Sequence, residues 1–149
     1  MGDYVSDILR MSRKYNFYPR EIEMDCLASL GFAYKYTNKY GGDVDIDICP
    51  ICDGGEMIGF YITHSYKGCP NGGDKVGDKD ITLGKFYFLK PEYRRRGYFT
   101  KHISLLKDKS DEIWIDTDKK PMIHALDKLG FKFVRVCDSG KELCYSWKK

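Results

Sequence analysis

The sequence predicts a single-domain α+β fold, and three observations lead to this prediction. Four segments place apolar residues at helical spacing, which is typical of amphipathic helices. Several other segments carry alternating or continuous apolar residues bounded by glycine or proline, which is typical of strands. The 149 residues are the length of one domain, and neither a linker nor an internal repeat divides them, so residues 1–149 are expected to share one core.

The composition excludes a disordered chain. Hydrophobic residues make up 42% of the sequence and charged residues 32%, so the apolar surface is large enough to offset the entropy lost on folding. A net charge of +3 is too small by itself to attract nucleic acid or an anionic membrane. No apolar run approaches the roughly 18 residues that cross a bilayer, and residues 1–4 lack the pattern of a secretory signal, so we expect a soluble cytoplasmic protein.

The first part of the chain is expected to be helical and then to enter a sheet. Apolar spacing predicts a helix over 3–15, which Asp3 can cap. A second helix begins at Pro19 and ends before Gly31, which suits the left-handed stop of a helix. A short strand over Phe32–Tyr36 follows.

An antiparallel hairpin is expected next. Val44, Ile46 and Ile48 alternate with aspartates, and a turn at 53–55 leads into a partner strand over Glu56–Tyr66. The remaining predicted elements are a polar loop over Gly68–Asp80, a central strand over Ile81–Leu89, a helix from Gly97 to about Lys107, a strand over Glu112–Thr117, a short helix between Pro121 and Gly130, and terminal strands over Phe131–Cys137 and Glu142–Trp147.

Residues 89–100 join the central strand to the next helix through an arginine-rich turn that contains Gly97. A helix N-terminus presents unpaired N–H groups and a partial positive charge, so a phosphate or pyrophosphate is a natural ligand of such a turn. Arg94, Arg95 and Arg96 add positive charge. A solvated basic turn before an ordinary helix has the same pattern, and this segment alone leaves both interpretations open.

Two motifs in the right order extend this interpretation. Arg94, Gly97 and Phe99 occupy the positions of a signature of Arg or Gln, two residues, Gly, one residue, then Gly or Ala. Residues 128–131, Lys-Leu-Gly-Phe, end the later short helix. Together with the element order, these motifs resemble the GNAT family of N-acetyltransferases over nearly the whole chain. Phe99 departs from the small residue usual at its position, which either pushes a pyrophosphate outward or requires the ring to turn away.

The resemblance implies a mixed, mostly antiparallel central sheet flanked by helices, whose parallel strands 81–89 and 112–117 splay apart. It also implies acetyl-CoA as co-substrate in that cleft, with direct acetyl transfer to a primary amine of a small molecule, peptide or protein. No metal is implied. The implied cofactor-binding residues are Phe88, Leu89 and Lys90 through main chain, then Arg94, Arg95, Arg96, Gly97, Tyr98, Phe99 and Thr100 at the pyrophosphate, and Leu126.

The family's usual acid and base are missing. Its tyrosine falls on Leu126 and the glutamate of some members falls on Leu83, and neither side chain can titrate. His124 is turned about 200° from Leu126 on the helix and is expected to face away from the cofactor. The remaining candidates for proton transfer are Tyr87, which has the strand parity of Leu83, and Asp116 with Thr117 at the end of the splayed strand. A core aromatic at Tyr87 and a helix cap at Asp116 are the structural alternatives.

Other functions stay open at this point. A GNAT scaffold without acid and base would serve as a binding or regulatory protein, and Leu83 and Leu126 favour that alternative. A third, weaker hypothesis uses the three arginines with Lys101 and His102 as a nucleic-acid backbone contact. The acceptor amine is not specified by the sequence, and a homodimer is left open.

The cysteines and aspartates of the hairpin invite further hypotheses. The six cysteines are interpreted mainly as reduced thiols, because the chain is not visibly secreted. A zinc site formed by Cys49, Cys52, His64 and Cys69 would have a non-standard spacing of its ligands. A redox pair at Cys49 and Cys52 is discounted because a hairpin turn follows.

The aspartates Asp43, Asp45 and Asp47 are interpreted as a solvated face, or as a cleft rim that attracts a cationic amine. The loop Gly68–Asp80 is expected to be mobile and to help shape the acceptor site.

Overall fold

The computed structural model describes residues 4–15, 33–37, 41–70, 76–137 and 140–149. The predicted helix between Pro19 and Gly31 lies outside these residues. All the other predicted helices and strands are present, with ends shifted by a few residues. They are α1 (Tyr4–Lys14), β1 (Ala33–Thr37), β2 (Asp43–Asp53), β3 (Glu56–Gly68), β4 (Lys79–Leu89), the 3-10 turn η2 (Pro91–Tyr93), α2 (Tyr98–Lys109), β5 (Glu112–Thr117), α3 (Lys120–Lys128), β6 (Lys132–Val136) and β7 (Leu143–Lys148).

The described strands form one seven-stranded mixed sheet in the order β1-β2-β3-β4-β5-β7-β6. Only the β4–β5 pair is parallel among them, and every other neighbouring pair is antiparallel. The predicted α+β class and mostly antiparallel sheet are confirmed. The last strand, β7, inserts between β5 and β6, an order that the sequence pattern does not specify.

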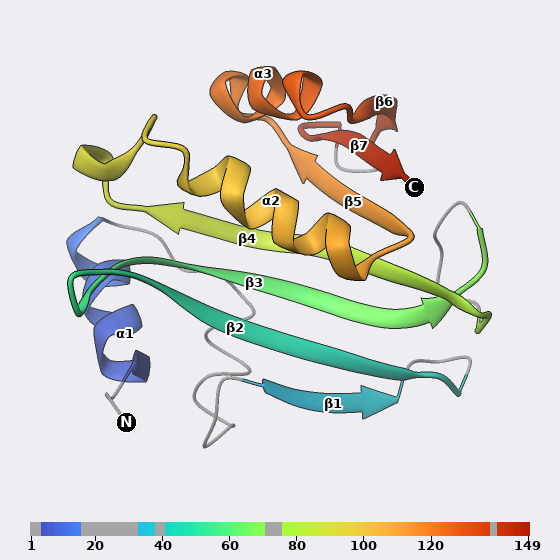
Figure 1. Cartoon of the computed structure of the whole chain (residues 1–149), viewed down its shortest axis with the longest axis horizontal. Helices are drawn as coiled ribbons and strands as arrows, with labels where there is room; N and C mark the ends of the chain where they lie inside the picture. Colours follow the sequence, from blue (N-terminus) through green and yellow to red (C-terminus); the bar gives the residue numbers. More distant parts are fainter. Residues whose placement is uncertain (1–3, 16–32, 38–40, 71–75, 138–139) are drawn as a thin grey trace.

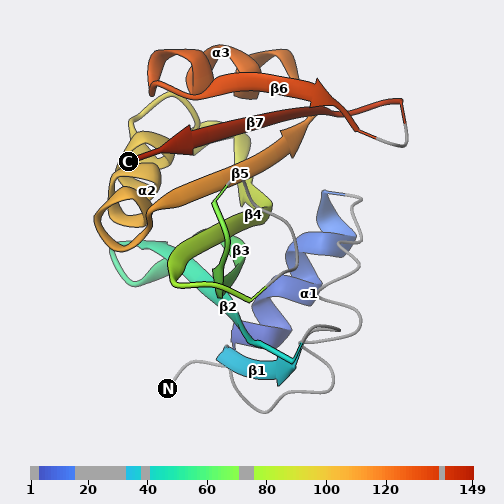
Figure 2. The ribbon, with the colours of Figure 1, turned by 90° about the vertical axis from the view of Figure 1, so that its right-hand side faces the viewer.

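Helices cover both faces of the sheet (Figures 1 and 2). One cluster of buried side chains lies between α1 and the sheet and includes Ile8, Ile48 and Phe60. A second cluster joins α2 and α3 to β5 and β7, with Ile103 and Leu126 at its centre. We refer below to the α1 face and the α2 face of the sheet. None of the described helices is long and apolar enough to span a membrane.

The segment predicted as the loop Gly68–Asp80 is paired at both of its ends. β3 extends to Gly68, β4 begins at Lys79, and Gly68 forms an isolated bridge with Val76. Residues 71–75 lie outside the described residues. The connection is therefore a hairpin at the beginning of β4, at the opposite end of that strand from the arginine turn, as Figure 1 shows. The expected mobility of this loop and its expected part in an acceptor site stay predictions.

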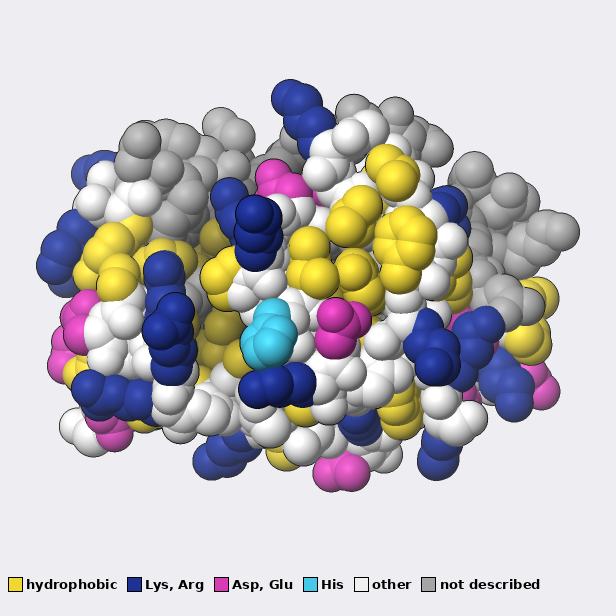
Figure 3. Space-filling model, turned by 90° about the horizontal axis from the view of Figure 1, so that it is seen from above, with side chains coloured by type: hydrophobic (Ala, Val, Ile, Leu, Met, Phe, Trp, Pro, Cys, Tyr) yellow, Lys and Arg dark blue, Asp and Glu magenta, His cyan; other side chains and the backbone are white. Residues whose placement is uncertain are grey.

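The sheet ends in the strand β6, all five residues of which are exposed. Its large apolar side chains Phe133, Val134 and Val136 are 53%, 42% and 52% exposed. Figure 3 looks down on this end of the molecule, where hydrophobic side chains gather with Lys and Arg around them. An exposed apolar strip of this kind is a feature of interaction surfaces.

Candidate active site

The parallel strands β4 and β5 separate along their length. They pair only from Ile81 with Glu112 to Gly84 with Ile115, whereas β4 continues to Leu89 with β3 as its partner. The last pair is close, because a Cβ on Gly84 would lie 2.9 Å from the Ile115 side chain. Beyond it the two strands diverge in Figure 1. The predicted splay of the two central strands is confirmed.

Beyond Gly84, one edge of β4 pairs with β3 and the other edge faces the splay. Successive residues of the strand direct their main-chain N–H and C=O groups to these two edges in alternation. The Lys90 N–H donates to the Ile58 carbonyl at 2.9 Å, so Lys90 and Phe88 direct their main-chain groups toward β3. Those of Tyr87 and Leu89 consequently point toward the splay. Of the three residues predicted to pair with pantetheine, only Leu89 presents main-chain groups to the cleft, and Tyr87 joins it. The Lys90 side chain forms an ion pair with Glu56 at 3.0 Å.

The arginine turn leads directly into an uncapped helix. Gly97 has a φ of 87° and precedes α2, and no side chain caps the helix. The first helical bond of α2 runs from the Lys101 N–H to the Gly97 carbonyl, so the N–H groups of residues 98–100 have no partner within the helix. Residues 94–97 and Thr100 are exposed, whereas Tyr98 is half-buried with its ring 6.5 Å from that of Tyr93. Free N–H groups at a helix N-terminus are able to bind an anion.

The side chains of the turn differ in where they lie. Arg94 donates from Nε to the Leu89 carbonyl at 2.8 Å, whereas the Arg96 guanidinium lies 5.3 Å from the centroid of the Tyr93 ring. The Phe99 ring is 5.0 Å from that of Tyr87, edge to face. Phe99 is therefore turned toward β4 and away from the helix N-terminus, the second of the two arrangements that its size allowed.

Tyr87 does not share a face with Leu83, contrary to the sequence prediction. Gly84 lies opposite Thr63 and Phe86 lies opposite Ile62, so Lys85 is an extra residue that forms a β-bulge. The bulge reverses the alternation of side chains. Leu83 packs on the α1 face against a third, smaller cluster formed by Val44, Tyr66 and Ile81. Tyr87 contacts Phe99 and His102 of α2 on the other face.

The Tyr87 hydroxyl is buried under α2. It has no hydrogen-bond partner among the described residues, and burial, with a smaller effect of Tyr98, raises the pKa of Tyr87 to about 12. The hydroxyl is thus protonated at neutral pH. It is therefore unsuited to act as a base.

Asp116 and Thr117 end β5 on opposite faces. The Asp116 side chain is exposed, and the thiols of Cys137 and Cys144 both hydrogen-bond to it. Burial and this carboxylate raise the pKa of Cys144 to about 12. The Thr117 hydroxyl accepts the Lys119 N–H at 3.1 Å and is 7% exposed. Thr117, rather than Asp116, therefore supports the entry to α3, and Asp116 is the more accessible of the two.

Leu126 is fully buried in the cluster that α2 and α3 share. Its side chain has no exposed surface to offer a cofactor in this structure, so it acts as a core residue. His124, two residues earlier, is exposed, as the helical rotation predicts.

His102 lies in the core between aromatic rings and was overlooked as a core residue by the sequence analysis. It is 7% exposed, with its ring centroid 3.8 Å from that of Tyr61 and 5.4 Å from that of Tyr87. This burial contradicts its predicted place in a nucleic-acid contact. The β-bulge at Lys85 turns Tyr87 toward α2 and so places an aromatic ring beside His102. The spacing of residues in the sequence does not reveal this bulge, which is why the burial of His102 was not predicted.

We expect the stability of the protein to fall as the pH decreases from about 6.5 to about 4. Burial, with the nearby charge of Lys109, lowers the pKa of His102 to about 4, so only the unfolded chain binds this proton in that range. The lowering of the His102 pKa from 6.5 to about 4 corresponds to a loss of at most about 3 kcal/mol in the free energy of unfolding. Denaturant unfolding against pH measures it. His102→Phe should remove this part of the pH dependence, and the exposed control His124→Phe should retain it; equal slopes in both variants would contradict the prediction.

The strand geometry excludes the zinc site that the spacing of Cys49, Cys52, His64 and Cys69 left open as an alternative. Cys52 lies opposite Met57 near one end of β3, and Cys69 follows the other end, roughly 40 Å away along the strand. The Cys69 thiol instead contacts the Val76 carbonyl at 3.4 Å. Across the described part of the chain, no group of three or more His, Cys, Asp or Glu side chains can hold a metal.

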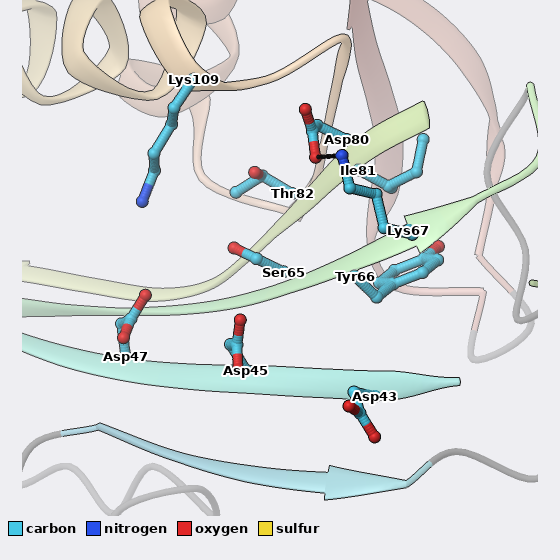
Figure 4. A pocket seen from close by; sticks show the side chains of 10 residues that line it. All are labelled: Asp43, Asp45, Asp47, Ser65, Tyr66, Lys67, Asp80, Ile81, Thr82 and Lys109. Carbon is cyan, nitrogen blue, oxygen red and sulfur yellow. Dashed lines mark ion pairs between the residues drawn. The ribbon is translucent and has the colours of Figure 1, made fainter. Parts of the chain in front are cut away.

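Three of the β2 aspartates, Asp43, Asp45 and Asp47, line a groove of about 460 Å³ on the α2 face (Figure 4). Lys109 extends over it, and Lys67 and Asp80 form an ion pair of 2.6 Å at its edge. The groove meets β4 at Asp80–Thr82, roughly 20 Å along the strand from the arginine turn. On β4 the groove ends two residues before Gly84, where β4 and β5 cease to pair, so the hypothesis that these aspartates attract a cationic amine stays a prediction.

The arrangement of the strands and helices matches that of solved acetyltransferases. Arabidopsis thaliana NAA60, solved in complex with a bisubstrate analogue, aligns with a TM-score of 0.61 over 97% of this chain and 91% of its own, at 12% identity. An acetyltransferase of the GNAT family from Staphylococcus aureus Mu50 gives 0.51 over 98% and 89%, at 13% identity. The chain has the GNAT fold.

Comparison of the sequence with protein families and with curated proteins identifies no relative of this chain. No protein-family model matches the chain, and no curated protein matches it significantly. An acetyltransferase from Thermus thermophilus aligns with a TM-score of 0.51 over 85% of this chain and 71% of its own, at 11% identity. At such identities the likeness establishes the GNAT fold, and the function has to be argued from the residues.

Proposed function

We propose that this protein is an acetyl-CoA-dependent N-acetyltransferase that acts on a primary amine. The observation that carries the proposal is the open edge of β4 beyond Gly84, which leads directly into the arginine turn and the uncapped start of α2. An extended chain with amide groups can pair with such an edge, and a pyrophosphate can bind the N–H groups at its end. The acetyl-CoA molecule combines these two parts. The GNAT fold adds support at the level of analogy.

The co-substrate supplies the thioester, and the residues of the chain orient it. The main-chain groups of Tyr87 and the N–H of Leu89 would hold the pantetheine arm, since the Leu89 carbonyl accepts from Arg94. The N–H groups of residues 98–100 would bind the pyrophosphate, with Arg95 and Arg96 exposed beside them. Orientation of two reactants in this way can supply several kcal/mol of the barrier reduction.

Two side chains are proposed to move protons. The neutral amine attacks the thioester carbonyl, the carbon–sulfur bond breaks, and the amine loses a proton. Asp116, an exposed carboxylate at the end of β5, would accept that proton through solvent. Tyr87, kept protonated by its high pKa, would donate to the leaving thiolate. The rate should rise with pH until the acceptor amine is deprotonated.

A non-catalytic binding protein is the second candidate. The specific observation in its favour is that Leu83 and Leu126, the positions of the family's base and acid, both pack in the core. Such a protein would bind acetyl-CoA or CoA without transfer. Confirmed binding with no transfer in a broad screen of amine acceptors would favour this candidate.

Thermal unfolding in the presence of acetyl-CoA, CoA and adenosine tests the cofactor proposal. A ligand that binds only the folded state raises its stability by RT ln(1 + [L]/Kd), which is about 2.7 kcal/mol at 100 times Kd. Acetyl-CoA and CoA are expected to raise the melting temperature in proportion to log concentration, and adenosine to have little effect. No shift with any acyl-CoA would overturn the proposal.

Leu126→Tyr is expected to destabilise the fold rather than to restore a missing acid. Leu126 is fully buried, and a larger side chain in a packed core costs about 1 to 3 kcal/mol. Denaturant unfolding measures the loss, and Leu105→Tyr at an exposed position of α2 is the matched control. A Leu126→Tyr variant of unchanged stability and faster transfer would show that the side chain reaches the cleft after all.

A further inference from the structure

The side chain of Arg94 is docked on the strand that precedes it. Its Nε donates to the Leu89 carbonyl at 2.8 Å, and its guanidinium carbon lies 5.7 Å from the centroid of the Phe88 ring. Leu89 and Phe88 are 5% and 8% exposed. Arg94 thus has specific contacts within the protein before any ligand is bound.

These contacts join the two ends of the turn. The Leu89 carbonyl points away from β3 because the next residue, Lys90, bonds to that strand. The hydrogen bond from Arg94 therefore connects the open edge of β4 to the residue that follows η2. It closes a loop of six residues around Pro91.

Residues 95–97 adopt uncommon backbone conformations and make few backbone hydrogen bonds. Arg95 has a φ of 63° and Gly97 a φ of 87°. Such conformations persist only where the surrounding structure holds them. Arg94 bonds through its N–H to the Pro91 carbonyl, but in the described part of the chain no backbone hydrogen bond outside helices and strands involves Arg95 or Arg96. The side chain of Arg94 is the nearest anchor for this segment.

We propose that Arg94 is a positioning residue rather than a ligand of the phosphates. It ties the turn to β4 and thereby directs the N–H groups of the turn and of α2 toward an anion, whereas Arg95 and Arg96 supply the charge that the anion meets. The identity of the anion, the pyrophosphate of CoA, rests on the proposed function. The positioning is a property of the free protein.

The free protein provides the first test. In nitrogen-15 NMR spectra of the unliganded protein, the Arg94 Nε–H should exchange with solvent at least 10-fold more slowly than those of Arg95 and Arg96. Arg94→Met should accelerate amide hydrogen exchange at residues 93–97 without changing it in α3. Equal exchange at the three arginine Nε–H groups would overturn the proposal.

CoA titrations at several salt concentrations provide the second test. Arg94→Gln keeps a donor nitrogen at the same number of bonds from Cα but removes the charge, and Arg94→Met removes both. We expect Arg94→Gln to bind CoA within about 3-fold of wild type, and Arg94→Met to bind at least 10-fold more weakly with an unchanged dependence on salt. The double variant Arg95→Gln, Arg96→Gln should instead reduce the salt dependence.

Two results would separate the possible failures. If Arg94→Gln loses as much affinity as Arg94→Met and also reduces the salt dependence, Arg94 contacts the phosphates directly and the positioning role is wrong. If the wild-type protein does not bind CoA at all, the proposed function is wrong, and the exchange measurement on the free protein decides the role of Arg94.

Discussion

Gly97→Asp is expected to abolish CoA binding, with a loss of affinity of about 100-fold or more. The side chain would enter the space in front of the uncapped α2 N-terminus, where no atom lies within 4 Å of an added Cβ. Its carboxylate would compete for the free N–H groups and repel the pyrophosphate. Isothermal titration calorimetry with CoA measures the effect.

A second glycine allows the backbone strain of Gly97→Asp to be separated from the effect of its charge. Gly97 has a φ of 87°, and Gly41, at the opposite end of the sheet, has a φ of 89° with equally open surroundings. Gly41→Asp therefore has the same conformational cost without a charge at α2, and should leave CoA binding unchanged. Gly97→Ala should lie between the two variants. A Gly97→Asp protein that folds and binds CoA as tightly as wild type would refute the pyrophosphate site.

Tyr87→Phe is expected to slow acetyl transfer by about 100-fold while the protein remains as stable as wild type or becomes more stable. The factor is the lower end of the usual contribution of general acid catalysis. The hydroxyl is buried and has no hydrogen-bond partner among the described residues, so its removal also removes an unsatisfied polar group. Measurements of kcat at saturating acetyl-CoA and of thermal unfolding test both parts.

Tyr61→Phe is the control for this experiment and should show the opposite pattern. The Tyr61 hydroxyl hydrogen-bonds the Cys49 thiol on the same face of the sheet, so its loss should reduce stability and leave kcat nearly unchanged. If Tyr87→Phe transfers acetyl groups at the wild-type rate, Tyr87 is a core aromatic and the leaving thiolate departs without an acid from this residue.

The sequence alone determined those features that depend on local physical chemistry. Alternation in Val44, Ile46 and Ile48 specified a strand, because the side chains of a strand alternate between its faces. The arginine-rich segment with Gly97 specified a turn between a strand and a helix, because glycine interrupts regular structure. The order of these local signals was also sufficient for the resemblance to the GNAT fold.

The tertiary structure decided which side chains meet, since a single extra residue can reverse a face. The bulge at Lys85 placed Tyr87 under α2 and Leu83 on the other side, although both have the same parity in sequence. The position of β7 beside β5 brought the thiols of Cys137 and Cys144 to Asp116. The docking of Arg94 on Leu89 likewise depends on the turn of η2. Such contacts depend on strand register and on the path of each turn, which the spacing of apolar and polar residues does not encode.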